Sequence, residues 1–193
     1  MFEAFDKNIT NHVSLSSDEL ALVHQLFQHK ICRKKTMLLD KGQVCGFEAF
    51  IIKGCVKRYY IDHEGDEVIL QFAVENWWLS DMVSFTEQVP SLLYIETIED
   101  TELLQITFQN KELLFKEIPK LERVFRLLVQ RAYSVLENRF FTGLTASAEE
   151  RYLNFIKKYP VLPQRVPQYQ IASYLGITPE ALSRIRASLL RKK

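Results

Sequence analysis

The sequence predicts an α+β protein with an N-terminal antiparallel β-roll of the jelly-roll type, one long helix and a C-terminal helix-turn-helix. Three patterns carry this prediction: short β-rich runs between turn residues, one long helical repeat of apolar residues, and two short helical patterns joined at a glycine. The 193 residues are 47% hydrophobic and 12% aromatic, so the chain can bury a sizeable core. We expect the roll over residues 1–118, the long helix over 119–143 and the helix-turn-helix domain over 144–193.

The part before the long helix combines one amphipathic helix with many short strands. Residues 14–29 have the apolar spacing of a helix, which Ser16 or Ser17 can cap. Turn residues separate six β-rich runs, which we predict to be strands: 36–39, 47–52, 56–61, 67–74, 92–98 and 102–106. Many short strands at this spacing favour an antiparallel sandwich or barrel.

The predicted long helix covers residues 119–142 and would be roughly 35 Å long at about 1.5 Å per residue. Its apolar residues recur at spacings of three and four and form a wide face. Part of this face can pair with a second copy of the helix, and the alternative is a helix packed only on its own roll. We expect Gly143 to end the helix. The residues assigned to the dimer contact are Leu121, Phe125, Leu128, Ala132 and Val135.

A hinge and a second helix are predicted to follow the long helix. Ser147 and Glu150 have the spacing of a capping box, and the helix that they start should end near Pro160. Residues 161–167 are too rich in proline for a helix. We expect a short hairpin or wing there, which makes the C-terminal domain a winged helix-turn-helix.

Residues 170–190 have the pattern of the helix-turn-helix itself. Gly176 stands where a left-handed residue is needed to end the first helix. Thr178 can cap the second helix, and Pro179 suits its first position. The second helix has a buried stripe of Leu182, Ile185 and Leu189 and a polar, basic outer face. Because such a helix suits the major groove of DNA, gene regulation is the leading hypothesis.

Positive charge is concentrated at the C-terminal end of the chain. Residues 151–193 contain nine basic residues and one acidic residue, a net charge of +8, whereas the rest of the chain has a net charge of −7. This asymmetry indicates a polyanionic partner for the C-terminal piece alone.

Membrane spans, targeting segments and cysteine centres have no signal in the sequence. No apolar run approaches the roughly 18 residues of a membrane span, and the N-terminus lacks the regions of a signal peptide. Cys32, Cys45 and Cys55 are odd in number and lack CxxC spacing. We therefore expect thiols in a reducing cytoplasm, no metal site, and no four-cysteine cluster; a redox role of these thiols stays open.

The order of these elements resembles the Crp/Fnr superfamily of bacterial transcription regulators. The resemblance is carried by Lys53-Gly-Cys-Val56 and Asp62-His-Glu-Gly-Asp-Glu-Val-Ile-Leu70 in the roll, and by Ile171–Ile177 and Glu180–Arg184 in the helix-turn-helix. The tail from Ser183 to Arg191 is similar to that of Bacteroidetes-type members. The resemblance implies a cyclic-nucleotide-binding-like roll, a dimerisation helix and a DNA-binding domain.

The effector pocket implied by the resemblance is degenerate. In members that bind cyclic nucleotides, a phosphate cassette contains a Gly-Glu pair and, about ten residues later, an Arg-Ser or Arg-Thr pair. Ser80-Asp81 and Ser91-Leu92 stand at these places, and no Lys or Arg occurs between Asp81 and Thr101. A cyclic phosphate would lack its countercharge, so we do not expect cyclic AMP or cyclic GMP to bind in the usual way. The residues of this pocket are Trp78, Ser80, Asp81, Met82, Ser91 and Leu92; no cofactor is predicted, and the effector is unidentified.

Three residues of the second helix match the Glu-x-x-Ser-Arg pattern of Fnr-like members. Glu180, Ser183 and Arg184 are expected to read bases, because arginine pairs with a guanine edge and glutamate accepts from cytosine. An ion pair between Glu180 and Arg184 is the competing role. The residues expected to contact phosphates are Gln168, Gln170, Thr178, Arg186 and Lys192.

The sequence therefore predicts a cytoplasmic, homodimeric transcription regulator that is not an enzyme and has no catalytic residues. It would bind double-stranded DNA, and RNA polymerase if it is an activator, without contacting a membrane. One alternative is a sensory module without DNA readout, against which the +8 C-terminal piece argues. The other is a cupin-like metalloenzyme, which needs two or three histidines on neighbouring strands, whereas only His63 falls in the central β-rich region.

Overall fold

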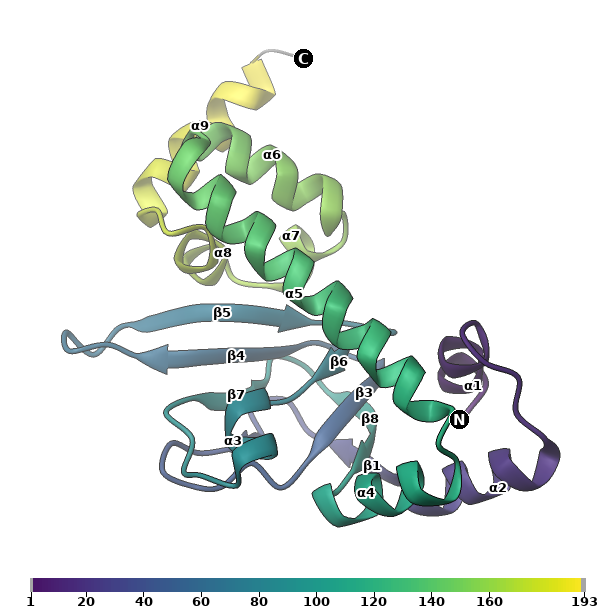
Figure 1. The fold of residues 1–193 in the computed structure, drawn as a ribbon. Coiled ribbons are helices and arrows are strands. Elements are labelled where there is room, and N and C mark those ends of the chain that lie inside the picture. The colour runs from purple at the N-terminus through teal and green to yellow at the C-terminus, as the bar shows by residue number, and fades with distance from the viewer. Residues whose placement is uncertain (1, 192–193) are drawn as a thin grey trace. The chain divides into compact units, whose positions relative to one another are not determined.

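The computed structural model describes residues 2–191, which form two compact units (Figure 1). The first unit contains the described residues up to Tyr59 together with Phe72–Gln130. The second unit contains Tyr60–Gln71 and the described residues from Arg131 onward. The segment Tyr60–Gln71, which we call the hairpin, is thus grouped with the C-terminal helices, although in the sequence it contains the end of one strand of the roll, a turn and most of the next strand.

The strands of the described residues form two four-stranded sheets. One has the order β1-β8-β3-β6 and the other the order β2-β7-β4-β5. The pairs β1–β8, β3–β8, β3–β6, β2–β7 and β4–β7 are antiparallel, which confirms the predicted class of fold. The bounds are β1 (Gln28–Cys32), β2 (Met37–Leu39), β3 (Glu48–Lys53), β4 (Val56–Ile61), β5 (Glu67–Ala73), β6 (Trp78–Leu79), β7 (Tyr94–Thr97) and β8 (Thr101–Ile106).

The six predicted strands correspond to β2, β3, β4, β5, β7 and β8, whereas β1 and β6 were not predicted. β1 is an edge strand with the sequence Gln-His-Lys-Ile-Cys, of which only Cys32 is buried, so no alternating pattern marks it. Because β1 begins at Gln28, the predicted helix 14–29 is shorter than expected. It is α2 (Ser17–Leu26), and Ser16 caps it in a capping box with Glu19.

Strand β3 in the middle of the sheet β1-β8-β3-β6 is buried on both of its faces. Ala49 and Ile51 of β3 face the core between the two sheets, whereas Phe50 faces a second core. Side chains of three helices, α1 (Glu3–Thr10), α2 and α4 (Phe108–Glu117), and of the first turns of α5 (Leu121–Thr145) complete that second core. Burial on both faces explains why successive residues of β3 are apolar.

The long helix α5 is close to its prediction, but two expectations about it are wrong. Gly143 does not end the helix, because it lacks the left-handed conformation that Gly176 has and α5 continues to Thr145. Leu121 and Phe125 are 0% and 4% exposed and lie in the core of their own unit, where Leu128 also packs. These three residues therefore pack as in the alternative, a helix on its own roll.

The C-terminal part of the second unit is helical throughout its described residues. It consists of α6 (Ala148–Lys158), α7 (Leu162–Arg165), α8 (Gln168–Leu175) and α9 (Pro179–Arg191). The predicted capping box at the start of α6 is confirmed, with Ser147 and Glu150 bonding each other's backbone N–H. The predicted hairpin or wing over 161–167 is wrong. Pro163 lies in the first turn of α7, where proline is tolerated, and Leu162 and Val166 are buried.

The hairpin is closed by a tight turn between β4 and β5. One carboxylate oxygen of Asp62 accepts the N–H groups of Glu64 at 2.9 Å and of Asp66 at 3.0 Å, and Gly65 takes a positive φ of 90°. Asp62 N–H donates to the Asp66 carbonyl at 3.0 Å, which brings the two strand ends together.

The structure also bears on the expectations about membrane spans and cysteine thiols. No helix of the described residues is long and apolar enough to cross a membrane. Cys32, Cys45 and Cys55 are buried, and none forms a disulfide.

Candidate DNA interface and effector cassette

The turn between α8 and α9 has the geometry that the sequence predicts. Gly176 has φ +65°, and the N–H of Ile177 donates to the Ala172 carbonyl at 3.1 Å, which satisfies the end of α8. The Thr178 hydroxyl accepts the N–H of Ala181 at 3.2 Å and caps α9. Leu182 is 1% exposed and anchors α9 against α8 and α6.

The three predicted base-reading residues all lie on the exposed surface of α9. Glu180, Ser183 and Arg184 are each exposed, and their spacing of three and four residues places them on one side of the helix. Hydrogen bonds from its own backbone N–H and from the Thr178 hydroxyl lower the pKa of Glu180, and the charge of Arg184 lowers it less. The carboxylate is therefore ionised at neutral pH and can accept a hydrogen bond from a base.

The predicted phosphate contacts divide into three groups. Gln168 and Thr178 are exposed and Arg186 is half-buried, so these side chains can reach a backbone phosphate. Gln170 is only 5% exposed, and its amide nitrogen donates to the Tyr169 hydroxyl at 3.4 Å. Its burial contradicts the expected phosphate contact. Lys192 lies outside the described residues.

Tyr169 is a surface residue of the first helix that the sequence reasoning missed. It is 57% exposed in the first turn of α8, where side chains and N–H groups of a helix-turn-helix commonly meet phosphates. The sequence alone does not show which residues of this first turn face outward; in the structure Gln168 and Tyr169 are exposed and Gln170 is buried.

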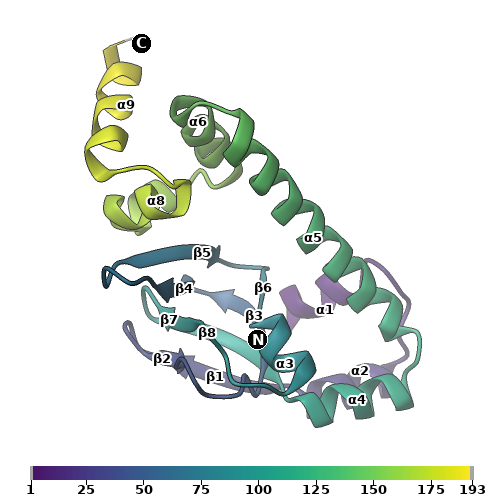
Figure 2. The same ribbon diagram turned by 60° about the vertical axis from the view of Figure 1, so that its left-hand side comes forward.

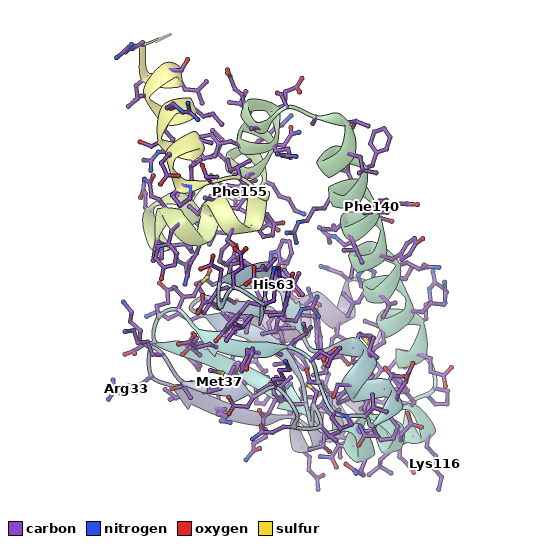
Figure 3. All side chains as sticks on the ribbon, turned by 90° about the vertical axis from the view of Figure 1, so that its left-hand side faces the viewer. Arg33, Met37, His63, Lys116, Phe140 and Phe155 are labelled. Atoms are coloured by element: carbon purple, nitrogen blue, oxygen red, sulfur yellow. The ribbon has the colours of Figure 1, made fainter. Side chains whose placement is uncertain are left out.

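An aromatic cluster holds the helix-turn-helix onto α6. Phe155 of α6 (labelled in Figure 3) lies 5.5 Å from the ring of Tyr174 of α8, and Tyr159 lies 5.3 Å from Phe155. Burial raises the pKa of the Tyr159 hydroxyl well above its usual range, so that group stays neutral. α6, α8 and α9 therefore form one packed body that presents the outer face of α9.

The predicted effector cassette is a cluster of buried polar groups that bond one another. Asp81 caps the short helix α3 (Met82–Glu87) and accepts the Ser91 hydroxyl at 2.6 Å. The Ser80 hydroxyl donates to the Phe47 carbonyl at 3.0 Å. The Ser84 hydroxyl donates to the Val89 carbonyl at 2.6 Å and accepts the N–H of Cys45 at 2.8 Å. Together with the contact of the Cys45 thiol to the Ser80 hydroxyl at 3.7 Å, these bonds link Ser80, Asp81 and Ser91 into one network. Their role in an effector pocket stays a prediction.

Arg58 of β4 is the positive charge that the sequence analysis missed at this cassette. Its guanidinium donates to the Ser80 carbonyl at 2.5 Å. Val56, two residues earlier, and Ile95, opposite Arg58 in β7, both belong to the core between the sheets, so Arg58 projects toward the same side. The segment 81–101 contains no positive charge, as predicted. The folded cassette nevertheless has one, because Arg58 reaches it from β4.

The other three residues predicted for the pocket, Trp78, Met82 and Leu92, are not part of this buried polar cluster. Trp78 packs on the core of α1, α2 and α5 and donates its indole N–H to the Asn8 side chain at 3.0 Å, so its assignment to the pocket is wrong. Its sequence neighbour Leu79 is the one that faces the core between the sheets. Met82 and Leu92 are 38% and 73% exposed.

The exposed apolar face of α5 lies further along the helix than predicted. Ala132 is exposed and Val135 half-buried, whereas five large apolar residues stand out in the solvent at helical spacing. These are Val129, Tyr133, Leu136, Phe140 and Leu144, which are 45–72% exposed. Figure 3 labels Phe140 on this helix. These residues, at spacings of three and four, form an exposed apolar row along one side of α5.

No group of three or more potential metal ligands occurs among residues 2–191. The described part of the chain therefore contains no cluster of side chains that could hold a metal ion.

Solved structures with the same arrangement cover almost the whole chain. The c-di-GMP-responsive global regulator CLP of Xanthomonas campestris matches with a TM-score of 0.73 at 14% identity, over 92% of this chain and 93% of that one. FixK2 of Bradyrhizobium japonicum matches with a TM-score of 0.74 at 16% identity, over 86% and 85%. A regulator of Eubacterium rectale assigned to the Crp/Fnr family matches with a TM-score of 0.69 at 16% identity, over 92% and 85%.

The chain has the fold of the Crp/Fnr regulators. No protein-family model and no curated protein matches the sequence, so the likeness lies in the three-dimensional structure. The Crp/Fnr fold joins a cyclic-nucleotide-binding-like roll to a helical C-terminal domain through a long helix, as the resemblance implied. In this chain α7 stands where a wing was expected, and Arg58 enters the cassette from β4.

Proposed function

We propose that this chain is a transcription regulator of the Crp/Fnr type that binds promoter DNA as a homodimer. The observation that carries the proposal is the outer face of α9. Glu180, Ser183 and Arg184 are exposed side by side on a helix whose start is capped and whose inner side is anchored by Leu182. This combination of rigid support and exposed hydrogen-bonding groups suits direct readout in the major groove.

The homodimer is supported by the exposed row on α5. A helix pair would remove Tyr133, Leu136 and Phe140 from water, and each is more than 60% exposed in the single chain. Burying three such side chains stabilises an interface by roughly 1.5–3 kcal/mol each. Two-fold pairing also gives two recognition helices, which matches an operator of two half-sites.

The cassette favours control without a cyclic nucleotide in the usual binding mode. Asp81 is bonded to Ser91, and Arg58 is bonded to the Ser80 carbonyl, so a nucleotide would have to break both contacts. Isothermal titration of the whole protein with cyclic AMP and with cyclic GMP tests this. We expect no heat of binding at micromolar concentrations; micromolar binding that is lost in Asp81→Ala would show that the cassette works in the usual way.

The experiment that tests the proposed function is selection of bound genomic fragments followed by sequencing. We expect enrichment of an inverted repeat whose half-sites lie one helical turn of DNA apart, about 34 Å. Selection by a variant with Glu180, Ser183 and Arg184 all replaced by Ala is the matched control and should enrich no such repeat. Equal enrichment by both proteins contradicts readout by α9, and no enrichment by the natural chain favours a sensory module without DNA readout.

A further inference from the structure

Within the second unit, the open edge of strand β5 is occupied by side chains of α8 and α5. β5 is the last strand of the sheet β2-β7-β4-β5, so one of its sides has no neighbouring strand. The Ser173 hydroxyl of α8 donates to the Glu67 carbonyl at 2.6 Å and accepts the N–H of Ile69 at 3.0 Å. A residue of a parallel strand would bond these same two groups, which flank Val68. Ser173 therefore takes the place of a strand residue, and Figure 2 shows α8 beside β5.

Arg139 of α5 fastens the same edge to the end of α8. Its guanidinium donates to the carbonyls of Leu70, of Ile69 at 3.1 Å and of Tyr174 at 2.8 Å. The guanidinium carbon also lies 4.0 Å from the centre of the Tyr174 ring. The Tyr174 carbonyl is in the last turn of α8, where carbonyls lack helical partners and a positive charge is favourable. One side chain thus joins α5, the hairpin and the helix-turn-helix.

We infer that Ser173 and Arg139 are positioning residues for DNA binding, which latch the helix-turn-helix to the hairpin and to α5. The inference rests on the proposed function. The latch uses the last turns of α8 and leaves Glu180, Ser183 and Arg184 exposed, so it does not cover the reading face. It fixes the direction in which that face points.

A fixed direction matters only when two half-sites are bound together. When one recognition helix of a dimer has bound its half-site, binding of the second half-site is an intramolecular step. The strength of that step depends on how well the two recognition helices are held at the spacing of the operator. A helix-turn-helix freed from the hairpin would still recognise a single half-site, because the rings of Phe155 and Tyr159 on α6 still hold α8 through Tyr174. Loss of the latch should therefore weaken binding to two half-sites and spare binding to one.

Hydrogen exchange of the whole protein without DNA tests the latch itself. The amide of Ile69 should exchange about tenfold faster in Ser173→Ala, because that variant removes the hydroxyl that accepts this N–H at 3.0 Å. Ser173→Thr keeps a hydroxyl and should restore protection, and Ser188→Ala on α9 is the control that should change nothing at Ile69. The same exchange of Ile69 in the natural chain and in Ser173→Ala overturns the latch.

Fluorescence anisotropy with the selected operator and with a duplex carrying one half-site tests the positioning role. Ser173→Ala and Arg139→Ala should bind the operator about tenfold more weakly and the half-site within about twofold of the natural chain. Arg139→Lys, which keeps the charge and loses the planar fork, should not restore operator binding, and Arg123→Ala on the exposed surface of α5 is the control.

Each other outcome of the anisotropy experiment is informative. Equal losses on both duplexes, unchanged operator binding or tighter operator binding overturns the positioning role. If the natural chain binds neither duplex, the proposed function and the positioning role both fail. Exchange at Ile69 then still decides whether the latch exists, so the two failures are distinguishable.

Discussion

The Asp81 carboxylate accepts the Ser91 hydroxyl at 2.6 Å, and the two side chains are 6% and 2% exposed. Both residues stand at positions where the resemblance places contacts to the sugar and the cyclic phosphate. Here the same positions bond each other, and Asp81 caps α3 at the same time. The cassette is therefore held together by its own side chains.

Replacing Asp81 should destabilise the fold because its carboxylate accepts two hydrogen bonds, from the Ser91 hydroxyl and from the Ser84 N–H. Asp81→Ala leaves the buried Ser91 hydroxyl and the Ser84 N–H without this acceptor and should lower the free energy of unfolding by about 1–3 kcal/mol. Urea unfolding measures the change. Glu64→Ala in the exposed hairpin turn is the control and should stay within about 0.5 kcal/mol; similar values for the two variants would show that the buried pair contributes nothing.

Replacing Arg184 should affect recognition and leave the fold intact. The side chain is exposed on α9, so Arg184→Ala should cost about 1–3 kcal/mol of operator binding and relax the preference at one G·C position. Competition assays with operators changed at single base pairs measure both effects. Arg191→Ala, at the end of the same helix, should weaken binding to all sequences alike. An unchanged base preference in Arg184→Ala removes this residue from base reading.

Charged residues in the exposed row of α5 should separate the proposed dimer. Leu136→Glu combined with Phe140→Glu places two like charges in the helix contact, and analytical ultracentrifugation should then show a monomer. Leu113→Glu on α4, which is also an exposed apolar position, is the control and should remain a dimer. If the double variant and the natural chain sediment alike, the row on α5 is not the dimer contact.

The capping box of α6 should make part of the stability depend on pH. Hydrogen bonds from the Ser147 backbone N–H and hydroxyl lower the pKa of Glu150. A lowered folded-state pKa means that this stabilisation is present above the unfolded pKa, about 4.3, and is lost as the pH falls through the folded value. The midpoint of thermal unfolding should therefore be lower for Glu150→Gln than for the natural chain at pH 7. The difference between the two midpoints should shrink at acidic pH. A gap that stays constant with pH would exclude the carboxylate as its cause.

Sequence patterns predict those parts of this fold that depend on local chemistry. The capping box Ser147–Glu150, the left-handed Gly176 and the cap Thr178 each satisfy backbone groups within a few residues, and each is confirmed. Six strands are also predicted correctly, because their apolar residues and the turn residues between them are local signals too. The wing prediction is wrong because a proline-rich segment can still form a helix when its proline, here Pro163, lies in the first turn.

Other features depend on contacts between distant parts of the chain and have weak local signals. Arg58 meets the cassette through the register of β4 with β7, which no single-strand pattern reveals. Leu121 and Phe125 repeat like dimer residues, but α4 and the strands of their own unit cover them. The bonds of Ser173 to the hairpin join residues more than one hundred positions apart.

The most direct test of the account is the ratio of affinities of the natural chain for its selected operator and for a scrambled duplex. We expect the operator to bind at least about 10³-fold more tightly. We also expect affinity for both duplexes to fall steeply between about 50 and 200 mM salt, because the basic C-terminal piece displaces counterions. A ratio near one at both salt concentrations would contradict sequence-specific DNA binding by α9.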